Sequence, residues 1–221
     1  MFRSAALVSV MALMAAAARA TDCLPLAGVG CYFIPDDMTE DAALLIYLRG
    51  HHPTYGPNVP AGECMTSAQQ AFAAYELGKI AREKRIAVLV TYRSGLGVTA
   101  SDLEALAFQS RRTFSKTVLA SHSGGYVGLG RTLDSGLTAS RVIMLDNFYG
   151  AGGDGLAMKL QRRISAGTAC AGFYTPHNKK NYDTGYKGSI QCSIDALGSD
   201  AQHNPGVARC LGGYLDGRSC L

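Results

Sequence analysis

The chain has 221 residues, of which 48% are hydrophobic and 17% are charged, and its formal net charge is +4 at pH 7. This is the composition of an ordinary globular protein, and the length allows one domain with a sizeable core. A charge this small disfavours nucleic-acid binding, so we expect no nucleic-acid partner.

The first 20 residues have the pattern of a secretory signal peptide. Arg3 gives a positive start, the apolar run AALVSVMALMAAAA follows, and the sequence ARA at 18–20 fits the small-residue rule for cleavage. The run is too short for a comfortable transmembrane helix, and no second run of spanning length follows. We therefore expect residues 1–20 to be removed and residues 21–221 to form a single domain. It would be secreted or periplasmic, without stable membrane insertion.

All seven cysteines lie after the predicted signal peptide. In an oxidising compartment this number allows up to three disulfides and leaves one odd thiol. The sequence leaves the pairing open. Cys23 with Cys31 and Cys210 with Cys220 are the natural suggestions, because each pair is close in the chain and would fasten one terminus. A cysteine nucleophile is the less favoured reading of the odd thiol, because no cysteine lies in a strained turn.

Apolar runs that predict buried strands alternate with segments of helical spacing along most of the chain. The predicted strands are 42–50, 86–92, 117–121, 141–145, 168–175 and a final one at 188–194. The predicted helices are 65–85 (capped by Thr66 or Ser67), 99–112 (with Ser101 and Glu104 as a capping box), 124–133, 154–164 and one that starts at Pro205 after the cap Asn204. This alternation predicts a three-layer α/β sandwich, with a mostly parallel central sheet and helices on both faces.

One short bend carries the strongest chemical signal. In TVLASHSGGYVGLG, residues 117–130, a buried strand leads through Ser123 directly into a glycine-rich helix. A serine presented at such a strained turn needs small residues two positions before and after it, and these are Ser121 and Gly125. The usual pattern is Gly-x-Ser-x-Gly, and Ser-x-Ser-x-Gly keeps the small side chains. The helix start would offer N–H groups to a developing oxyanion.

With this motif between a strand and a helix, the sequence from Ala42 to the C-terminus resembles the α/β-hydrolase family. The resemblance implies a serine nucleophile at Ser123 and the chain order serine, acid, histidine. It also implies an oxyanion hole formed by the N–H of Gly124 and a second N–H from the loop after the first strand. In that loop, RGHHPTYGPN, the second N–H would come from His51, and Gly50 would allow a close backbone approach.

The chain has five histidines, and two of them follow Ser123 with room for an acid between. His203 precedes the last helix, where the family carries its base, and we prefer it. His177 in TPHNKK also fits a plain surface histidine. Both residues remain candidates at this point.

The acid has two main candidates. Asp146 ends the strand 141–145, at the carboxyl edge of the sheet where functional residues gather, and we prefer it. Asp183 remains the alternative, because the family's acid usually follows the next strand. Asp195 and Asp200 are too close to His203 in the chain to be favoured. Asp146 could also be a plain turn residue.

Two other ligand-binding patterns are weaker. The pair His51 and His52 could hold a metal, but no HExxH or carboxylate–histidine spacing supports one. The sequence GAGGDG at 150–155 fits a dinucleotide loop, but it does not follow the strand directly and no acid lies near Cys170. No Gly-Lys-Ser/Thr sequence occurs, which excludes a P-loop. We expect neither a metal nor a cofactor.

The sequence thus predicts a secreted serine hydrolase in which Ser123, His203 and Asp146 cleave an ester. The substrate would be a small-molecule, lipid or polysaccharide ester. A peptidase or amidase with the same three residues is one alternative. A binding protein on a hydrolase scaffold, without catalysis, is another. The oligomeric state stays open.

Overall fold

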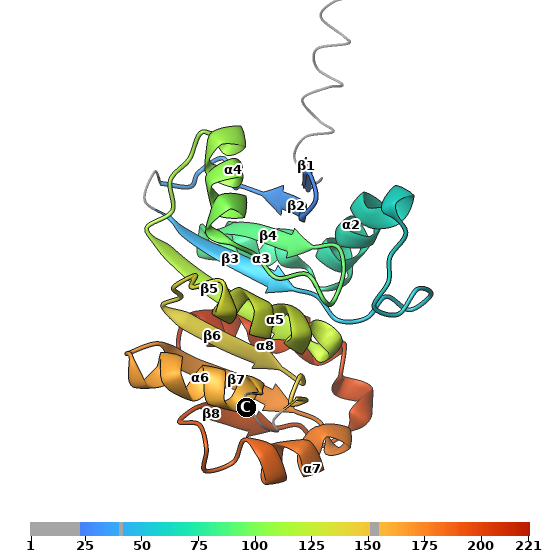
Figure 1. The fold of residues 1–221 in the computed structure, drawn as a ribbon, viewed down its shortest axis with the longest axis vertical. Helices are drawn as coiled ribbons and strands as arrows, with labels where there is room; N and C mark the ends of the chain where they lie inside the picture. The colour runs from blue at the N-terminus through green and yellow to red at the C-terminus, as the bar shows by residue number, and fades with distance from the viewer. Residues whose placement is uncertain (1–22, 40–41, 151–154) are drawn as a thin grey trace, which may run out of the picture.

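A computed structural model describes residues 23–39, 42–150 and 155–221 of the chain (Figure 1). The predicted signal peptide at 1–20 lies outside the described residues. So does most of the predicted GAGGDG loop, at 151–154.

The described residues form a sheet of eight strands in the order β1-β2-β4-β3-β5-β6-β7-β8. The strands are β1 (Leu24–Leu26), β2 (Gly30–Phe33), β3 (Ala43–Leu48), β4 (Ala87–Thr91), β5 (Lys116–His122), β6 (Arg141–Leu145), β7 (Ala169–Tyr174) and β8 (Ser193–Ala196). β1 pairs antiparallel with β2, and β2 antiparallel with β4. The neighbouring strands in the part of the sheet ordered β4-β3-β5-β6-β7-β8 pair in parallel, as the sequence predicts.

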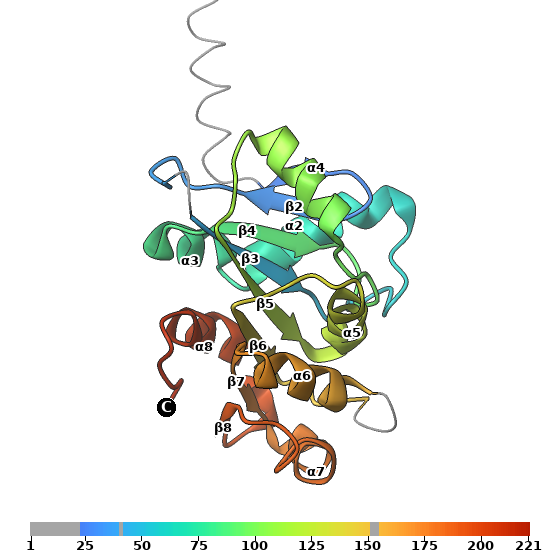
Figure 2. The same ribbon diagram turned by 60° about the vertical axis from the view of Figure 1, so that its left-hand side comes forward.

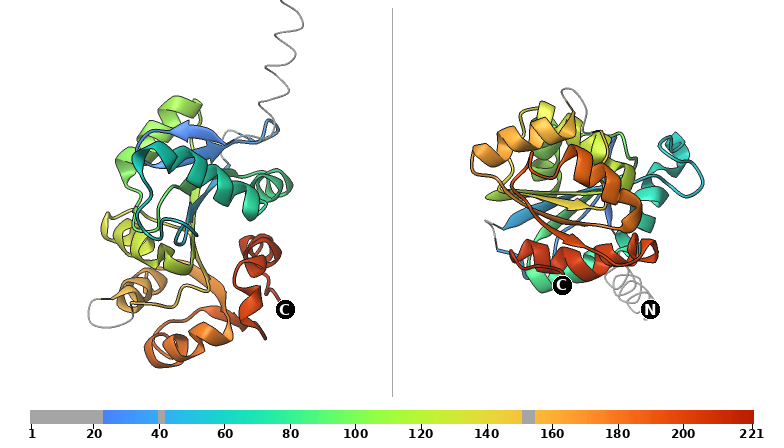
Figure 3. Two further views of the ribbon diagram at one scale, coloured as in Figure 1. Left: turned by 90° about the vertical axis from the view of Figure 1, so that its right-hand side faces the viewer. Right: turned by 90° about the horizontal axis from the view of Figure 1, so that it is seen from below.

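Helices cover both faces of the sheet (Figure 3). They are α2 (Cys64–Ala74), α3 (Leu77–Lys84), α4 (Ala100–Ser110), α5 (Tyr126–Asp134), α6 (Leu156–Ser165), α7 (Pro176–Gly185) and α8 (Pro205–Leu215). One core lies between the sheet and α2, α3 and α8, and includes Leu77 and Leu211. The other lies beneath α4, α5 and α6, and includes Leu106 and Leu129. The predicted three-layer sandwich is therefore confirmed.

The central strands are apolar on both faces, because helices cover both. The residues of β4 are all buried, and those of β3 and β6 are buried except the first of each. A parallel strand that is covered on both sides reads as a continuous apolar run, which is why its position was visible in the sequence.

The predicted helix at 65–85 is two helices. Glu76 has the left-handed backbone conformation (φ 51°), which ends α2 and lets α3 leave at a new angle. The ring of Phe72 lies so close to Gly78 that a methyl group there would be 2.9 Å from it. The helix also begins at Cys64, so neither Thr66 nor Ser67 is its cap, and that prediction was wrong.

Three other predicted details differ. Thr99 with Asp102, not Ser101 with Glu104, forms the capping box of α4. The side chain of Asn204 does not cap α8, although Pro205 is the first helical residue as predicted. The last strand is β8 at Ser193–Ala196 rather than 188–194.

Three disulfides link cysteines of the described chain. Cys23–Cys31 and Cys210–Cys220 are the two suggested pairs. Cys170–Cys192 joins β7 to the segment before β8. Cys64 is the free cysteine. Within the described residues, no helix combines the length and the apolar character needed to cross a membrane.

Candidate active site

Ser123 lies at a sharp turn between β5 and the helical segment η3 (Ser123–Gly125), which continues into α5. Its backbone is left-handed, with φ 51°, a conformation that costs energy for a residue other than glycine. A methyl group on Gly50 would lie 2.9 Å from the Cβ atom of Ser123. One on Gly125 would lie 2.9 Å from the carbonyl oxygen of Arg49. The turn therefore fits only because Gly50 and Gly125, which pack closely around it, have no side chain.

Asp146 follows β6 directly and is fully buried. Its carboxylate accepts hydrogen bonds from the N–H of Thr175 (2.9 Å), the hydroxyl of Thr175 (2.7 Å) and the side-chain amide of Asn178 (2.9 Å). Burial raises the pKa of Asp146, but the hydrogen bonds from His203, Thr175 and Asn178 outweigh burial and hold this pKa below its usual value. The side chain is therefore an anion.

His203 lies at the start of the segment that leads into α8, and its Nδ1 is 2.6 Å from Oδ2 of Asp146. Because an ionised carboxylate can only accept, Nδ1 carries the hydrogen and donates it. In this tautomer Nε2 is the nitrogen that can accept a proton, which is the arrangement a general base needs.

His122, which directly precedes Ser123, contacts His203. The ring of His122 lies 4.6 Å from the ring of His203, measured between centroids. In the described part of the chain the hydroxyl of Ser123 and the ring of His203 share no hydrogen bond. Catalytic hydrogen bonds are often long in the absence of substrate and shorten when it binds. The structure thus places His122, the residue before Ser123, against His203.

The two residues expected to form an oxyanion hole lie together. The ring of His51 covers Gly124 so closely that a methyl group there would be 2.6 Å from its Nε2. Within the described residues, the backbone N–H of His51 donates to no other backbone group. The loop that carries His51 therefore packs against Gly124, the residue after Ser123.

The comparison with solved structures agrees with this architecture. No protein-family model matches the sequence, and no curated protein matches it. Among solved structures, the chain is similar to LpqC, poly(3-hydroxybutyrate) depolymerase from Bordetella parapertussis, with a TM-score of 0.54 and 12% identity over 86% of this chain and 84% of that chain. The chain has the α/β-hydrolase fold. A structure described as a thermostable esterase aligns over 80% of this chain and 54% of that one at 13% identity, but its TM-score of 0.47 supports no conclusion.

The other residues that the sequence left open have structural roles in this α/β-hydrolase fold. Asp183 forms ion pairs with Lys179 and Lys187 on the side of α7. Asp195 accepts hydrogen bonds from the hydroxyls of Tyr214 and Ser219 and from the N–H of Cys220.

His177 and Asp200 form a hydrogen bond with each other. The backbone N–H of His177 donates to the carboxylate of Asp200 over 2.6 Å. Of the candidate acids, Asp146 is therefore the one that the structure brings to His203.

His52 is also structural. Its Nδ1 accepts hydrogen bonds from the N–H groups of Thr54 and Tyr55, so its Nε2 carries the hydrogen and donates to the side-chain oxygen of Gln70 over 3.0 Å. Both ring nitrogens are thus engaged within the loop. The described residues contain no group of three or more acidic, histidine or cysteine side chains placed to hold a metal ion.

Sequence reasoning missed the residues that hold the site in place. Arg49, which is 5% exposed, donates from its guanidinium to the carbonyl oxygens of Ser67 (3.1 Å) and Tyr92 (3.3 Å), and so fixes the loop that carries Gly50 and His51. Thr175 and Asn178 fix Asp146. Thr175 follows β7 at the carboxyl edge of the sheet, and that position is the one signal that could have indicated it.

His122 is a buried histidine with no hydrogen-bond partner at either ring nitrogen within the described residues. Burial, assisted by the neighbouring His203, lowers the pKa of His122 from 6.5 to about 3. In the unfolded chain the same ring takes up a proton near its usual pKa. Between these two values the unfolded state binds more protons, so stability falls as the pH falls.

We expect this effect to be visible in the variant His122→Phe, which cannot take up a proton. From pH 6 to pH 4, the wild-type protein should lose about 1.4 kcal/mol more unfolding free energy per pH unit than the variant. Urea denaturation at a series of pH values measures both curves. Parallel curves would contradict the lowered pKa, whatever the absolute stability of the variant.

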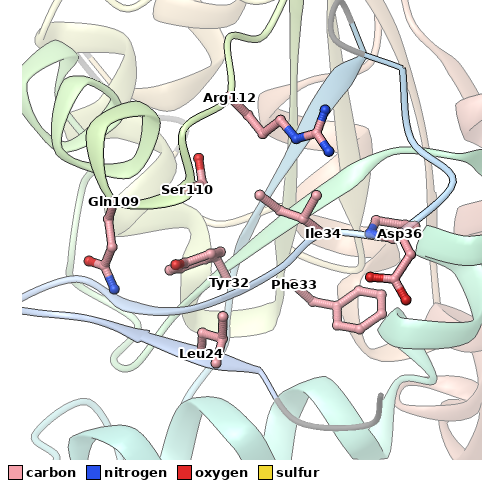
Figure 4. A pocket seen from close by; sticks show the side chains of 9 residues that line it. Leu24, Tyr32, Phe33, Ile34, Asp36, Gln109, Ser110 and Arg112 are labelled. Carbon is pink, nitrogen blue, oxygen red and sulfur yellow. The ribbon is translucent and has the colours of Figure 1, made fainter. Parts of the chain in front are cut away.

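A separate hollow of about 480 Å³ lies between the end of β2 and the end of α4 (Figure 4). Tyr32, Ile34 and Arg112 are among the side chains around it. Phe33, at the end of β2, pairs with Val88 near the start of β4, so this hollow is at the amino ends of the parallel strands. Ser123 is at the carboxyl end of β5, and the hollow is therefore not part of the candidate site.

Proposed function

We propose that this protein is a serine hydrolase that cleaves an ester through an acyl-enzyme intermediate. The hydroxyl of Ser123 attacks the acyl carbonyl, and Nε2 of His203 takes its proton. Asp146 holds the ring of His203 in the required tautomer and stabilises its protonated form. The N–H groups of Gly124 and His51 donate to the oxyanion.

The same residues complete acylation and then carry out deacylation. Protonated His203 gives its proton to the departing alkoxide, which leaves as an alcohol. Water then enters, loses a proton to His203 and attacks the acyl-enzyme carbonyl. Collapse of this second intermediate returns Ser123 and releases the acid, so no cofactor or metal takes part.

The observation that carries the proposal is the hydrogen bond between His203 and the buried anion of Asp146 beside the strained Ser123 turn. Asp146 and His203 are 57 residues apart in the chain, and the buried carboxylate of Asp146 forms an ion pair with no lysine or arginine among the described residues. A purely structural role for this pair would not require a left-handed serine next to it. The combination is what an activated serine needs.

An ester is the expected substrate because an alkoxide is a less demanding leaving group than an amine. A structural neighbour with a TM-score of 0.54 is described as a poly(3-hydroxybutyrate) depolymerase, which supports a small-molecule or polymer ester as the substrate of this chain. Three disulfides fit an oxidising compartment, so we propose that the protein is secreted or periplasmic after removal of residues 1–20.

Steady-state kinetics of residues 21–221 on p-nitrophenyl esters and on the matching p-nitroanilides tests the proposal. We expect turnover of acetyl and butyryl esters, with kcat/KM at least 100-fold above that of the anilides. Faster cleavage of the anilides would favour the amidase alternative. A folded protein that turns over neither series would favour a binding protein and contradict the proposal.

A further inference from the structure

An open groove of about 840 Å³ runs beside the candidate active site. It lies between the first turns of α3 and α8, which are neighbours in the fold (Figure 2). Its walls combine apolar and polar side chains, and Pro53, Ala74, Pro205 and Ala208 contribute the apolar part. In small-molecule binding sites, apolar walls provide contact area and polar groups fix the orientation of the ligand.

One end of the groove is lined by residues that adjoin His122 and His203. Tyr75 lines the groove, its ring meets the ring of His122 edge-on at 5.2 Å, and its hydroxyl donates to the side chain of Asn204 over 3.2 Å. Asn204 also lines the groove and directly follows His203. The groove therefore begins next to His203.

Charged side chains also line the groove. Glu76 and Lys79 form an ion pair with each other at 3.3 Å. Arg209, one turn into α8, is exposed and forms no ion pair with another described residue. The three side chains leave one positive charge without an opposite charge. A guanidinium in this position can donate two parallel hydrogen bonds to a carboxylate.

Because the groove lies next to His203, its position determines which half of the substrate the groove binds. His203 must reach the leaving oxygen to protonate it, so the alcohol half of the ester lies on the His203 side. We propose that the groove binds the alcohol half and that Arg209 binds a carboxylate on it. Given the proposed ester hydrolysis, on which this inference rests, the preferred substrate is an ester of a hydroxy acid whose carboxylate is free.

A matched pair of substrates tests this: 3-butyryloxybutyrate, and its neutral counterpart 3-butyryloxybutanamide. Both carry the same ester bond, and they differ in one charge on the alcohol half. We expect the wild-type protein to prefer the anion. In Arg209→Gln, kcat/KM for the anion should fall about 10-fold, mainly through KM, and that for the amide should stay within about twofold. Arg209→Lys should retain part of the preference.

Lys116→Gln is the control, since it removes one exposed positive charge at the start of β5, at the opposite end of the strand from Ser123. It should change neither substrate. Glu76→Gln should increase the preference for the anion, because it removes the carboxylate that competes for the cations of the groove.

The possible failures are distinguishable. If the protein hydrolyses the ester bond of 3-butyryloxybutanamide, and Arg209→Gln leaves the ratio of kcat/KM for the two substrates unchanged, the groove proposal is wrong. Ester hydrolysis then still stands. If the folded protein hydrolyses neither these substrates nor simple p-nitrophenyl esters, the proposed function is wrong, and the groove proposal fails with it.

Discussion

Ser123→Ala is expected to lower kcat for ester hydrolysis by about 10³- to 10⁶-fold. The hydroxyl is the attacking group in the proposed mechanism, and no acyl-enzyme can form without it. Residual turnover would come from the oxyanion donors, which can still polarise the substrate carbonyl. Steady-state kinetics on a p-nitrophenyl ester, with circular dichroism to verify folding, measures the effect.

Ser121→Ala is a close control for this experiment. Ser121 lies two residues before Ser123, is fully buried, and its hydroxyl has no hydrogen-bond partner in the described part of the chain. We expect Ser121→Ala to keep kcat within about threefold, since a buried hydroxyl without a partner contributes little to the fold. Full activity in Ser123→Ala, or an equal loss in Ser121→Ala, would argue against Ser123 as the nucleophile.

Asp146→Asn is expected to lower kcat by about 10⁴-fold while leaving KM nearly unchanged. An asparagine amide can turn its N–H₂ group toward His203, which then presents the wrong nitrogen to Ser123. The amide also cannot stabilise the protonated ring. Kinetics at pH 7 to 8 measures the loss.

Asp183→Asn is the matched control, because Asp183 pairs with Lys179 and Lys187 on α7, away from His203. We expect it to change kcat by less than about twofold, as is usual for exposed ion pairs. A large loss in Asp183→Asn with an active Asp146→Asn would show that the acid had been assigned to the wrong residue.

The sheet was predictable because its strands are buried on both faces. β4 and β6 stand out as apolar runs, and their limits follow the sequence closely. β1 and β2 have only three and four residues, too few to show a period, and they were not predicted. The break at Glu76 was not predicted either, because a left-handed glutamate between two helices depends on how they pack.

The candidate site was predictable to the extent that its chemistry depends on local sequence. The small residues around Ser123 indicate the turn, and the position of His203 before the last helix, where the resemblance places the base, favours it over His177. The choice between Asp146 and Asp183 depends on distances across the fold. Asp146 is the one that forms a hydrogen bond with His203, and Thr175 and Asn178 hold it in place. Thr and Asn are common in turns, so neither residue is conspicuous in the sequence.

Labelling with a fluorophosphonate, followed by peptide mass spectrometry, is the most direct test of the proposed mechanism. The reagent phosphonylates a serine only when a base activates its hydroxyl. We predict one adduct per chain, on the peptide that contains Ser123, with no adduct in Ser123→Ala and labelling slowed at least 100-fold in His203→Ala. A folded protein that takes up no label, or carries it elsewhere than Ser123, would contradict the proposed nucleophile.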